Sequence, residues 1–225
     1  MKTLLIVRHA RAEKATSDKT DDRRVITRRG EIESRRIVRK IKKQLPKPLL
    51  LITSPARRAL QTARIFAREM DIRVKKIRIE PQLYDSLNAR QFIEMVAATD
   101  PAVATVILFG HNPSLTDLAR LLLDDFSAEI QKSGAVALQL QSDQWNELLT
   151  APRQMLFYDY PPSDASAAPI TDLDPETEMA QRLYSHLHDF FEQIQPDAAN
   201  HLDEWIIRYS KKLARRYFKL PPRSH

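Results

Sequence analysis

Two histidines and two arginines stand at positions where they could act together on a phosphoryl group. Arg8 and His9 follow directly after a short apolar run. Arg58 comes soon after a second such run, and His111 follows a third. Arginine binds phosphate with a planar fork of N–H donors. A neutral histidine can attack phosphorus, and a protonated one can stabilise developing charge. These residue types predict phosphoryl transfer through a phosphohistidine, without a metal.

The composition excludes several other kinds of site. The chain has no cysteine, which excludes disulfides, thiolate metal sites and cysteine nucleophiles. Its three glycines, Gly30, Gly110 and Gly134, cannot form a Walker or dinucleotide-binding loop. His186 and His188 lie two residues apart on a predicted helix and therefore cannot share a face to bind a metal. We expect neither a metal nor another cofactor.

The elements that must position these residues alternate between strands and helices. Unbroken apolar runs predict strands buried on both faces at Thr3–Arg8, Leu49–Thr53 and Ala104–Phe109. Weaker or edge strands are predicted at Val74–Ile79, Gly134–Leu140 and Gln154–Tyr158, the last two antiparallel. Helical periodicity occurs at Arg29–Leu45, Ala56–Met70, Ala89–Ala98 and Ser114–Leu123. This alternation predicts a three-layer α/β/α sandwich with a mostly parallel sheet, in which strand ends bring the polar residues to one edge.

Four sequence blocks, taken in order, resemble the signature of a known family. They are Arg8-His9-Ala10, Asp21 to Gly30 (DDRRVITRRG), Ser54 to Ala63 (SPARRALQTA) and Gly110 to Ser114 (GHNPS). With their strand and helix flanks they resemble the histidine phosphatase superfamily, whose fold is that of phosphoglycerate mutase. Within it they are similar to the small bacterial SixA-type phosphohistidine phosphatases. The resemblance covers residues 1 to about 160, and Ala10 departs from the glycine that often follows the Arg-His pair.

The resemblance implies a role for each matching residue. His9 would be the nucleophile that becomes phosphorylated. Arg8 and Arg58 would clamp the phosphoryl oxygens, and His111 would complete the pocket as a cationic donor. Two further residues, Arg24 and Asn112, would extend phosphate binding.

The acid that protonates the leaving group is open among three carboxylates. The aspartate of the short branch's D-x-x-R segment corresponds to Asp21, which we favour. Mutase-type members use a glutamate after the third strand, where this chain has Glu80 without the usual flanking glycines. Asp85 lies nearby and ranks second, before Glu80. For both of these a capping or loop-solvating role is the simpler interpretation.

The substrate class depends on how open the site is. Only about thirty residues separate Glu80 from His111, and a predicted helix and strand occupy them. A helical lid of the mutase kind cannot be built there. We therefore expect a metal-independent phosphatase that acts on a phosphohistidine protein or a small phosphorylated compound. The alternative is a non-catalytic module that binds phosphate or phosphoproteins, against which the intact His9 and His111 argue.

The formal net charge of +7 raises the question of nucleic-acid binding. The basic residues crowd into the predicted helix Arg29–Leu45 and its approach, a pattern more typical of a solvated helix face. We therefore do not expect nucleic acid as a partner.

The composition changes after Tyr160. We predict a catalytic domain at residues 1–160, a linker rich in Pro, Ser and Ala at 161–172, and a C-terminal helical extension at 173–225. Two amphipathic helices joined near Pro196 predict an α-helical hairpin whose apolar stripes must be covered. A homodimer through this hairpin is one way to cover them. The chain shows no signal-peptide core and no transmembrane stretch, so we expect a cytoplasmic protein without a membrane partner.

Overall fold

A computed structural model describes residues 1–14, 20–84, 88–162 and 196–219. It also describes six single helical residues between these ranges, namely Glu176, Met179, Ala180, Leu183, Leu187 and Phe190. The chain forms two compact units, Met1–Pro162 and Ser163–His225, which are treated one at a time. Within the described ranges, no helix has the length and apolar character needed to cross a membrane.

The first unit is built on one sheet whose strands all lie in the described ranges. They are β1 (Lys2–Arg8), β2 (Leu49–Thr53), β3 (Arg78–Ile79), β4 (Thr105–Gly110), β5 (Ala135–Leu140) and β6 (Arg153–Asp159). The α-helices of this unit are α1 (Arg28–Ile41), α2 (Arg57–Glu69), α3 (Ala89–Ala97) and α4 (Ser114–Leu122). Short 3-10 turns are η1 (Asp21–Arg23), η2 (Lys42–Gln44), η3 (Val74–Lys76), η4 (Pro81–Leu83) and η5 (Trp145–Glu147).

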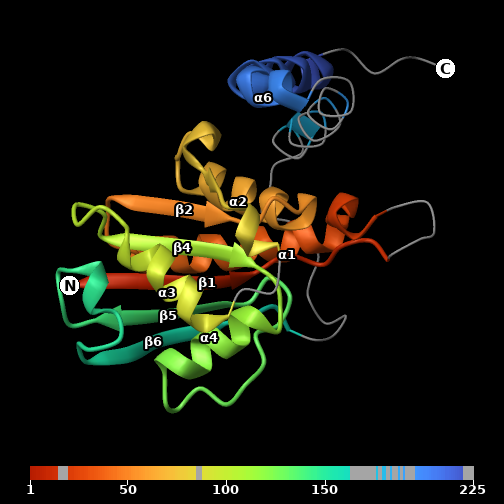
Figure 1. Cartoon of the computed structure of the whole chain (residues 1–225). Coiled ribbons are helices and arrows are strands. Elements are labelled where there is room, and N and C mark those ends of the chain that lie inside the picture. The colour runs from red at the N-terminus through yellow and green to blue at the C-terminus, as the bar shows by residue number, and fades with distance from the viewer. Residues whose placement is uncertain are drawn as a thin grey trace. The chain divides into compact units, whose positions relative to one another are not determined.

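The sheet has the strand order β3-β2-β4-β1-β5-β6. The strands β3, β2, β4 and β1 pair in parallel, whereas β5 pairs antiparallel with β1 and with β6. The arrows of β1, β2 and β4 accordingly point the same way in Figure 1. Arg8 at the end of β1 pairs with Gly110 at the end of β4. The residues that follow these two strands therefore leave the sheet side by side.

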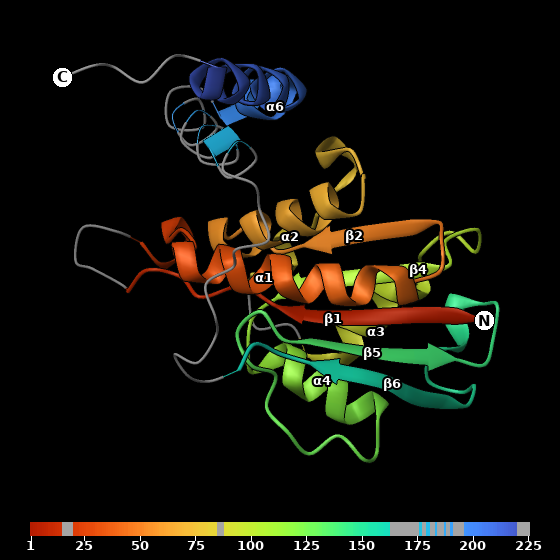
Figure 2. The ribbon, with the colours of Figure 1, turned by 180° about the vertical axis from the view of Figure 1, so that it is seen from behind.

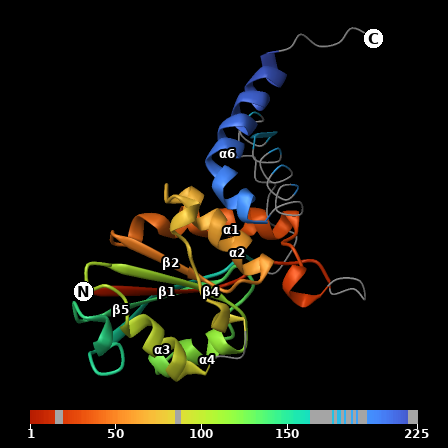
Figure 3. The ribbon, with the colours of Figure 1, turned by 45° about the horizontal axis from the view of Figure 1, so that its top comes forward.

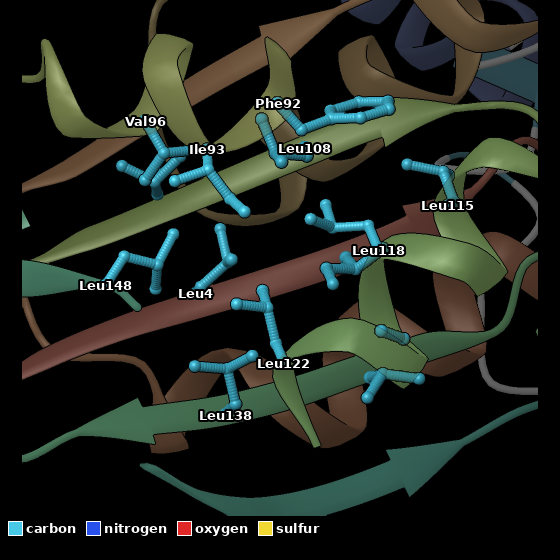
Figure 4. Close-up of a cluster of buried hydrophobic side chains, with 14 of the residues drawn as sticks. Leu4, Phe92, Ile93, Val96, Leu108, Leu115, Leu118, Leu122, Leu138 and Leu148 are labelled. Atoms are coloured by element: carbon cyan, nitrogen blue, oxygen red, sulfur yellow. The ribbon is translucent and has the colours of Figure 1, made fainter. Parts of the chain in front are cut away.

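Helices cover both faces of the sheet. α3 and α4 lie on the face toward the viewer in Figure 1, and α1 and α2 on the face toward the viewer in Figure 2. Figure 3 shows the sheet between these two helical layers. Neighbouring strand residues point to opposite faces. Leu4 of β1 (labelled in Figure 4) and Ile6 therefore join the core beneath α3 and α4, whereas Leu5 and Val7 join the core beneath α1 and α2. The predicted α/β/α sandwich with a mostly parallel sheet is confirmed.

Two predicted elements need correction. Val74–Ile79 was expected to be a strand, but only Arg78–Ile79 pairs with β2, and Val74–Lys76 forms the turn η3. The exposed Lys75 and Lys76 have no buried face to offer a sheet, so the backbone bonds locally instead, from Ile77 N to Val74 O. The helix predicted over Arg29–Leu45 ends as α-helix at Ile41 and finishes as the turn η2.

The second unit contains α6 (Pro196–Lys219). Pro196, expected in a connecting loop, is instead the first residue of this helix, a position where its missing N–H costs nothing. Ile206 is buried, while Trp205 and Tyr209 stack with ring centroids 4.4 Å apart and remain 46% and 42% exposed. Most of the first predicted hairpin helix and the predicted linker beyond Pro162 fall outside the described residues, so the hairpin stays a prediction.

Candidate active site

The carboxyl ends of β1, β2 and β4 bring the predicted site residues together. Beyond these strand ends the backbones stay joined, because His9 N donates to Gly110 O over 3.1 Å and Ser54 N donates to Phe109 O over 3.0 Å. The rings of His9 and His111 consequently lie 5.0 Å apart between centroids, with an interplanar angle of 56°. Parallel strands of matched length thus place two histidines, distant in sequence, in contact.

Polar residues of α2 hold the segment that carries His9. The backbone N–H of the buried Ala10 donates to Thr62 Oγ1 over 3.0 Å, and this hydroxyl donates to the Arg58 carbonyl over 2.7 Å. Nearby, Ile26 N donates to Gln61 Oε1 over 2.8 Å. Gln61 and Thr62 of the Ser54–Ala63 block therefore bind the backbone at Ile26 and Ala10 to α2, the helix that supplies Arg58.

The start of α1 explains the Thr-x-x-Gly spacing of the second block. Thr27 caps the helix, because its Oγ1 accepts from Gly30 N over 3.1 Å and donates to the Arg11 carbonyl over 3.2 Å. A Cβ at Gly30 would overlap the backbone of Arg11. Glycine is therefore required for α1 to approach the chain just after His9.

His9 is held as a neutral imidazole in one tautomer. Its Nδ1 donates to the Ala10 carbonyl over 2.7 Å, since a carbonyl oxygen can only accept. The other ring nitrogen, Nε2, then keeps its lone pair and accepts from Arg58 Nε over 3.3 Å. Burial is the main reason that the pKa of His9 falls from 6.5 to about 3, with the charges of neighbouring His111, Arg58 and Arg8 adding to the effect. Neutral His9 has the form that a nucleophile requires.

Arg58 and Arg24 hold the Asp21 carboxylate between them. Arg58 is buried, and its Nη2 donates to Asp21 Oδ2 over 2.7 Å, while its Nη1 donates to the Asp21 carbonyl. Arg24 Nη2 pairs with the other carboxylate oxygen, and its Nη1 donates to Glu13 O over 3.0 Å. Partial burial raises the pKa of the Asp21 carboxyl, but the two guanidiniums outweigh it and hold this pKa below its usual value. Asp21 is ionised in this arrangement.

His111 contacts side chains on two sides. Its Nε2 lies 3.0 Å from Ser54 Oγ, and the ring of Tyr84 meets it edge-on with centroids 6.1 Å apart. Ser54 Oγ already accepts from Ala56 N over 3.3 Å, which favours the hydroxyl as the donor to Nε2. Burial lowers the pKa of His111 to about 4, helped by the charge of Arg58. His111 is therefore neutral at neutral pH in this structure.

Arg8 and Asn112 both reach the loop between α4 and β5. Arg8 Nη1 donates to Glu129 Oε1 over 3.0 Å and to the Ile130 carbonyl over 2.7 Å. Asn112 Nδ2 donates to the same two oxygens, over 2.9 Å and 3.1 Å. The residues that end β1 and follow β4 are thus joined through one loop.

Several buried polar atoms of the site have no hydrogen-bond partner among the described residues. They are Arg8 Nε, Arg24 Nε, His111 Nδ1 and Asn112 Oδ1. A buried donor without a hydrogen-bond partner costs free energy, so these unpaired atoms at the sheet edge favour the binding of a polar ligand. A phosphoryl group would supply oxygens to the arginine and histidine nitrogens. Over the part of the chain that the structure describes, no three His, Asp or Glu side chains are grouped to hold a metal.

Glu80, one of the two alternative acids, forms its described side-chain hydrogen bonds away from this cluster. The Glu80 carboxylate accepts hydrogen bonds from Arg78 and from Gln82, both near it in sequence. Asp85 lies outside the described residues. Of the three carboxylates considered, Asp21 is the one with described contacts to Arg58 and Arg24.

Sequence reasoning missed four residues that line or support the site. Ser54 and Thr62 lie in the Ser54–Ala63 sequence block, where their polar side chains near Arg58 were a usable signal. Tyr84 and Glu129 carried no sequence signal, because neither belongs to a motif. Lys132 adds a further cation: partial burial and the charges of nearby arginines lower the pKa of its amine.

Residues 4–86 match the profile of the histidine phosphatase superfamily (branch 1). Over these residues the chain resembles this superfamily. The match contains the blocks that carry His9, Asp21 and Arg58, and the geometry above places His111 against them. The comparison with curated proteins found no match to this chain.

Solved structures with the same fold include two SixA proteins. One is a putative phosphohistidine phosphatase SixA from Agrobacterium tumefaciens, with a TM-score of 0.59 and 22% identity, covering 72% of this chain and 99% of the other. The other is a protein histidine phosphatase SixA complexed with tungstate, with a TM-score of 0.60 and 20% identity, covering 70% and 96%. A mycobacterial glucosyl-3-phosphoglycerate phosphatase reaches a TM-score of 0.53 at 14% identity, covering 72% and 100%. These likenesses show the fold of the chain.

Proposed function

We propose that this protein is a phosphatase that acts through a covalent phosphohistidine on His9. The observation that carries the proposal is the state of the His9 ring. Nδ1 is committed to the Ala10 carbonyl, and Nε2 presents its lone pair beside the buried Arg58. A merely structural histidine needs neither a fixed tautomer nor a phosphate-binding side chain on its free nitrogen.

In the first step His9 Nε2 attacks phosphorus, and the bond to the leaving group breaks with its electron pair on the leaving atom. Arg58 and Arg8 would stabilise the charge on the phosphoryl oxygens, with Arg24 and Asn112 at the margin of the pocket. His111 Nδ1 is available as a further donor, because Nε2 is occupied by Ser54. A bound dianion would raise the pKa of His111 and favour the cationic form that the family resemblance implies.

Asp21 is the group that we assign to proton transfer. The leaving atom takes a proton from Asp21 as it departs; in the second step water gives a proton back to Asp21 and attacks phosphorus, which releases phosphate and restores Nε2. Asp21 is ionised while Arg58 and Arg24 bind it. A phosphoryl dianion that draws Arg58 away and adds negative charge would raise the pKa of Asp21, so that it can hold the proton.

The proposed substrate is a phosphohistidine protein or a small phosphorylated compound. Among the described residues between η4 and His111, the regular elements are α3 and β4, so this segment supplies no additional helix to cover the site. An open edge admits a phosphate carried on another protein. The Agrobacterium tumefaciens structure is named as a putative phosphohistidine phosphatase and the mycobacterial structure as a glucosyl-3-phosphoglycerate phosphatase. The shared fold is compatible with either class of substrate.

The basic helix α1 gives little support to nucleic acid as a partner. Arg35 pairs with Glu31 and Glu69, and Arg39 pairs with Glu69 as well. These ion pairs engage much of the charge in packing α1 on α2.

A homodimer through the C-terminal segment and a cytoplasmic location remain proposals. The exposed stack of Trp205 and Tyr209 supports the homodimer. The mass of the protein in solution would test it.

The function is tested by trapping the intermediate. We would mix the protein with a phosphohistidine domain, a sugar phosphate or p-nitrophenyl phosphate, quench within one turnover, and locate the phosphate by mass spectrometry. The expected result is phosphate on His9. Turnover with phosphate on no histidine would refute the covalent route. Stable binding of phosphate without turnover on any of the three substrates would favour the alternative, a non-catalytic binding module.

A further inference from the structure

We propose that Glu129 is a positioning residue that orients Arg8 for the phosphoryl group. This inference rests on the proposed function, because it concerns the same pocket. Glu129 lies in the loop between α4 and β5, belongs to none of the sequence blocks, and is 121 residues from Arg8 in the chain.

One carboxylate oxygen of Glu129 joins the two strand ends. Oε1 accepts from Arg8 Nη1 over 3.0 Å and from Asn112 Nδ2 over 2.9 Å. The hydrogen bond from Asn112 and the charge of Arg8 hold the pKa of the Glu129 carboxyl below its usual range, so it is ionised. A charged acceptor with two donors fixes their relative positions better than a water molecule would.

The loop that carries Glu129 is itself anchored. Ile130 is fully buried, and its N–H donates to Thr116 Oγ1 over 3.1 Å. The Tyr158 hydroxyl of β6 donates to the Glu129 carbonyl and accepts from Gln131 N, both over 2.9 Å. The side chain of Glu129 is 59% exposed. Its backbone is nevertheless fixed by the buried Ile130 and by β6, so Glu129 can hold Arg8 in a defined position.

This arrangement uses one nitrogen of Arg8 and leaves another for a ligand. Nη1 is bound to Glu129 and Ile130, while Nε is buried without a described partner. An arginine with one end tethered loses less side-chain freedom when it binds an oxyanion. The tether thus prepares the remaining donors of Arg8 for phosphoryl oxygens.

A positioning role and a simple charge effect predict opposite results. As a nearby negative charge, Glu129 would repel a dianion, so that its removal would tighten binding. As a positioning residue, its removal would weaken binding because Arg8 becomes mobile. Glu129→Gln separates the two effects, since the amide keeps an Oε1 acceptor for both donors and loses the charge.

The test measures tungstate, a phosphate-shaped dianion, by calorimetry on the full chain. We expect Glu129→Ala to bind tungstate roughly tenfold more weakly than the unmodified protein, and Glu129→Gln to bind it at least as tightly. Arg120→Ala is the matched control, because Arg120 Nη2 bonds the same loop at Ser127 O and Ala128 O without touching Arg8. It should change tungstate affinity by less than about twofold.

The Arg8→Ala background decides whether the effect runs through Arg8. In that background Glu129→Ala should cause no further loss of tungstate affinity. Tighter binding by Glu129→Ala, an equal loss in Arg120→Ala, or a loss that persists without Arg8 would each overturn the proposal. Tungstate binding needs no turnover, so these outcomes are independent of the trapping experiment. Failure to phosphorylate His9 would refute the proposed function. The tungstate affinities of the Glu129 variants would still test the role of Glu129.

Discussion

Arg58 Nε donates a hydrogen bond to His9 Nε2 over 3.3 Å, and both side chains are buried. A group suited to bind phosphoryl oxygens thus sits on the nitrogen that would attack phosphorus. The Nε2 lone pair cannot accept a hydrogen bond from Arg58 and attack phosphorus at the same time. Arg58 must therefore move from Nε2 to the phosphoryl oxygens as the substrate binds. The same contact keeps the ring oriented until then.

Substitution of this pair should abolish or strongly reduce turnover. His9→Ala removes the atom that accepts phosphorus, so no activity is expected. Arg58→Ala should lower kcat/KM roughly a hundredfold, as the loss of one preorganised donor does elsewhere. Arg57→Ala, on the preceding and less buried residue, serves as the control and should retain most of the activity. A His9→Ala protein with half of the normal rate would refute the mechanism.

Asp21→Asn should change catalysis according to the leaving group. An alkoxide needs a proton as it departs, whereas p-nitrophenolate leaves readily without one. We therefore expect a loss of roughly a hundredfold on an alkyl phosphate and a much smaller loss on p-nitrophenyl phosphate. Rates on both substrates, measured with Asp22→Asn as the control for charge alone, test this. Equal losses would assign the acid to another residue.

The same variant should bind oxyanions more tightly. In the unmodified protein the Asp21 carboxylate competes with oxyanions for Arg58. The neutral amide of Asp21→Asn should bind the guanidinium more weakly, so the affinity for tungstate should rise roughly tenfold, or by about 1.4 kcal/mol. Asp22→Asn should give a smaller gain, because no described contact joins Asp22 to Arg58. Weaker tungstate binding by Asp21→Asn would show that Asp21 supports the ligand instead of competing with it.

Chelation should leave the activity unchanged. The proposed chemistry uses imidazole, guanidinium and carboxylate groups, and the described residues include no cluster of three metal-binding side chains. Hydrolysis of p-nitrophenyl phosphate before and after treatment with EDTA, with removal of the chelator, measures this. Activity that disappears on chelation and returns with added zinc or magnesium would contradict the mechanism.

Folding should become less favourable as the pH falls below about 6.5. The pKa of His9 is about 3 and that of His111 about 4 in the folded protein, against 6.5 for an ordinary histidine. Between these values the unfolded chain binds protons that the folded chain does not. Each histidine then costs at most about 1.4 kcal/mol of unfolding free energy per pH unit, and this slope fades as the pH rises from about 6.5 to about 7.5.

Urea unfolding at pH 7, 6 and 5 would measure this slope. Most carboxylates titrate lower: the pKa of Asp21 is held below its usual value, so its contribution is lost at more acidic pH. His111→Asn should remove part of the slope between pH 5 and 6.5. An unchanged slope in that variant would show that His111 titrates normally.

The sequence by itself determined the sandwich and the meeting of His9, Arg58 and His111. Short apolar runs make parallel buried strands, parallel strands end at one edge, and residues next to those ends must converge there. The Thr27 cap on Gly30 N is also local, because these two residues are three apart in the chain. Such patterns depend on neighbours in sequence, which is why they could be predicted.

Only the tertiary structure decided which carboxylates bind the arginines. Asp21 pairs with Arg58 and Glu129 with Arg8 across 37 and 121 residues, and the partners meet because turns and loops pack on the strand edge. Tyr84 reaches His111 in the same way. No periodicity or motif constrains a loop side chain to one distant partner. These contacts depend on how whole elements pack, and the charge state of the site depends on them.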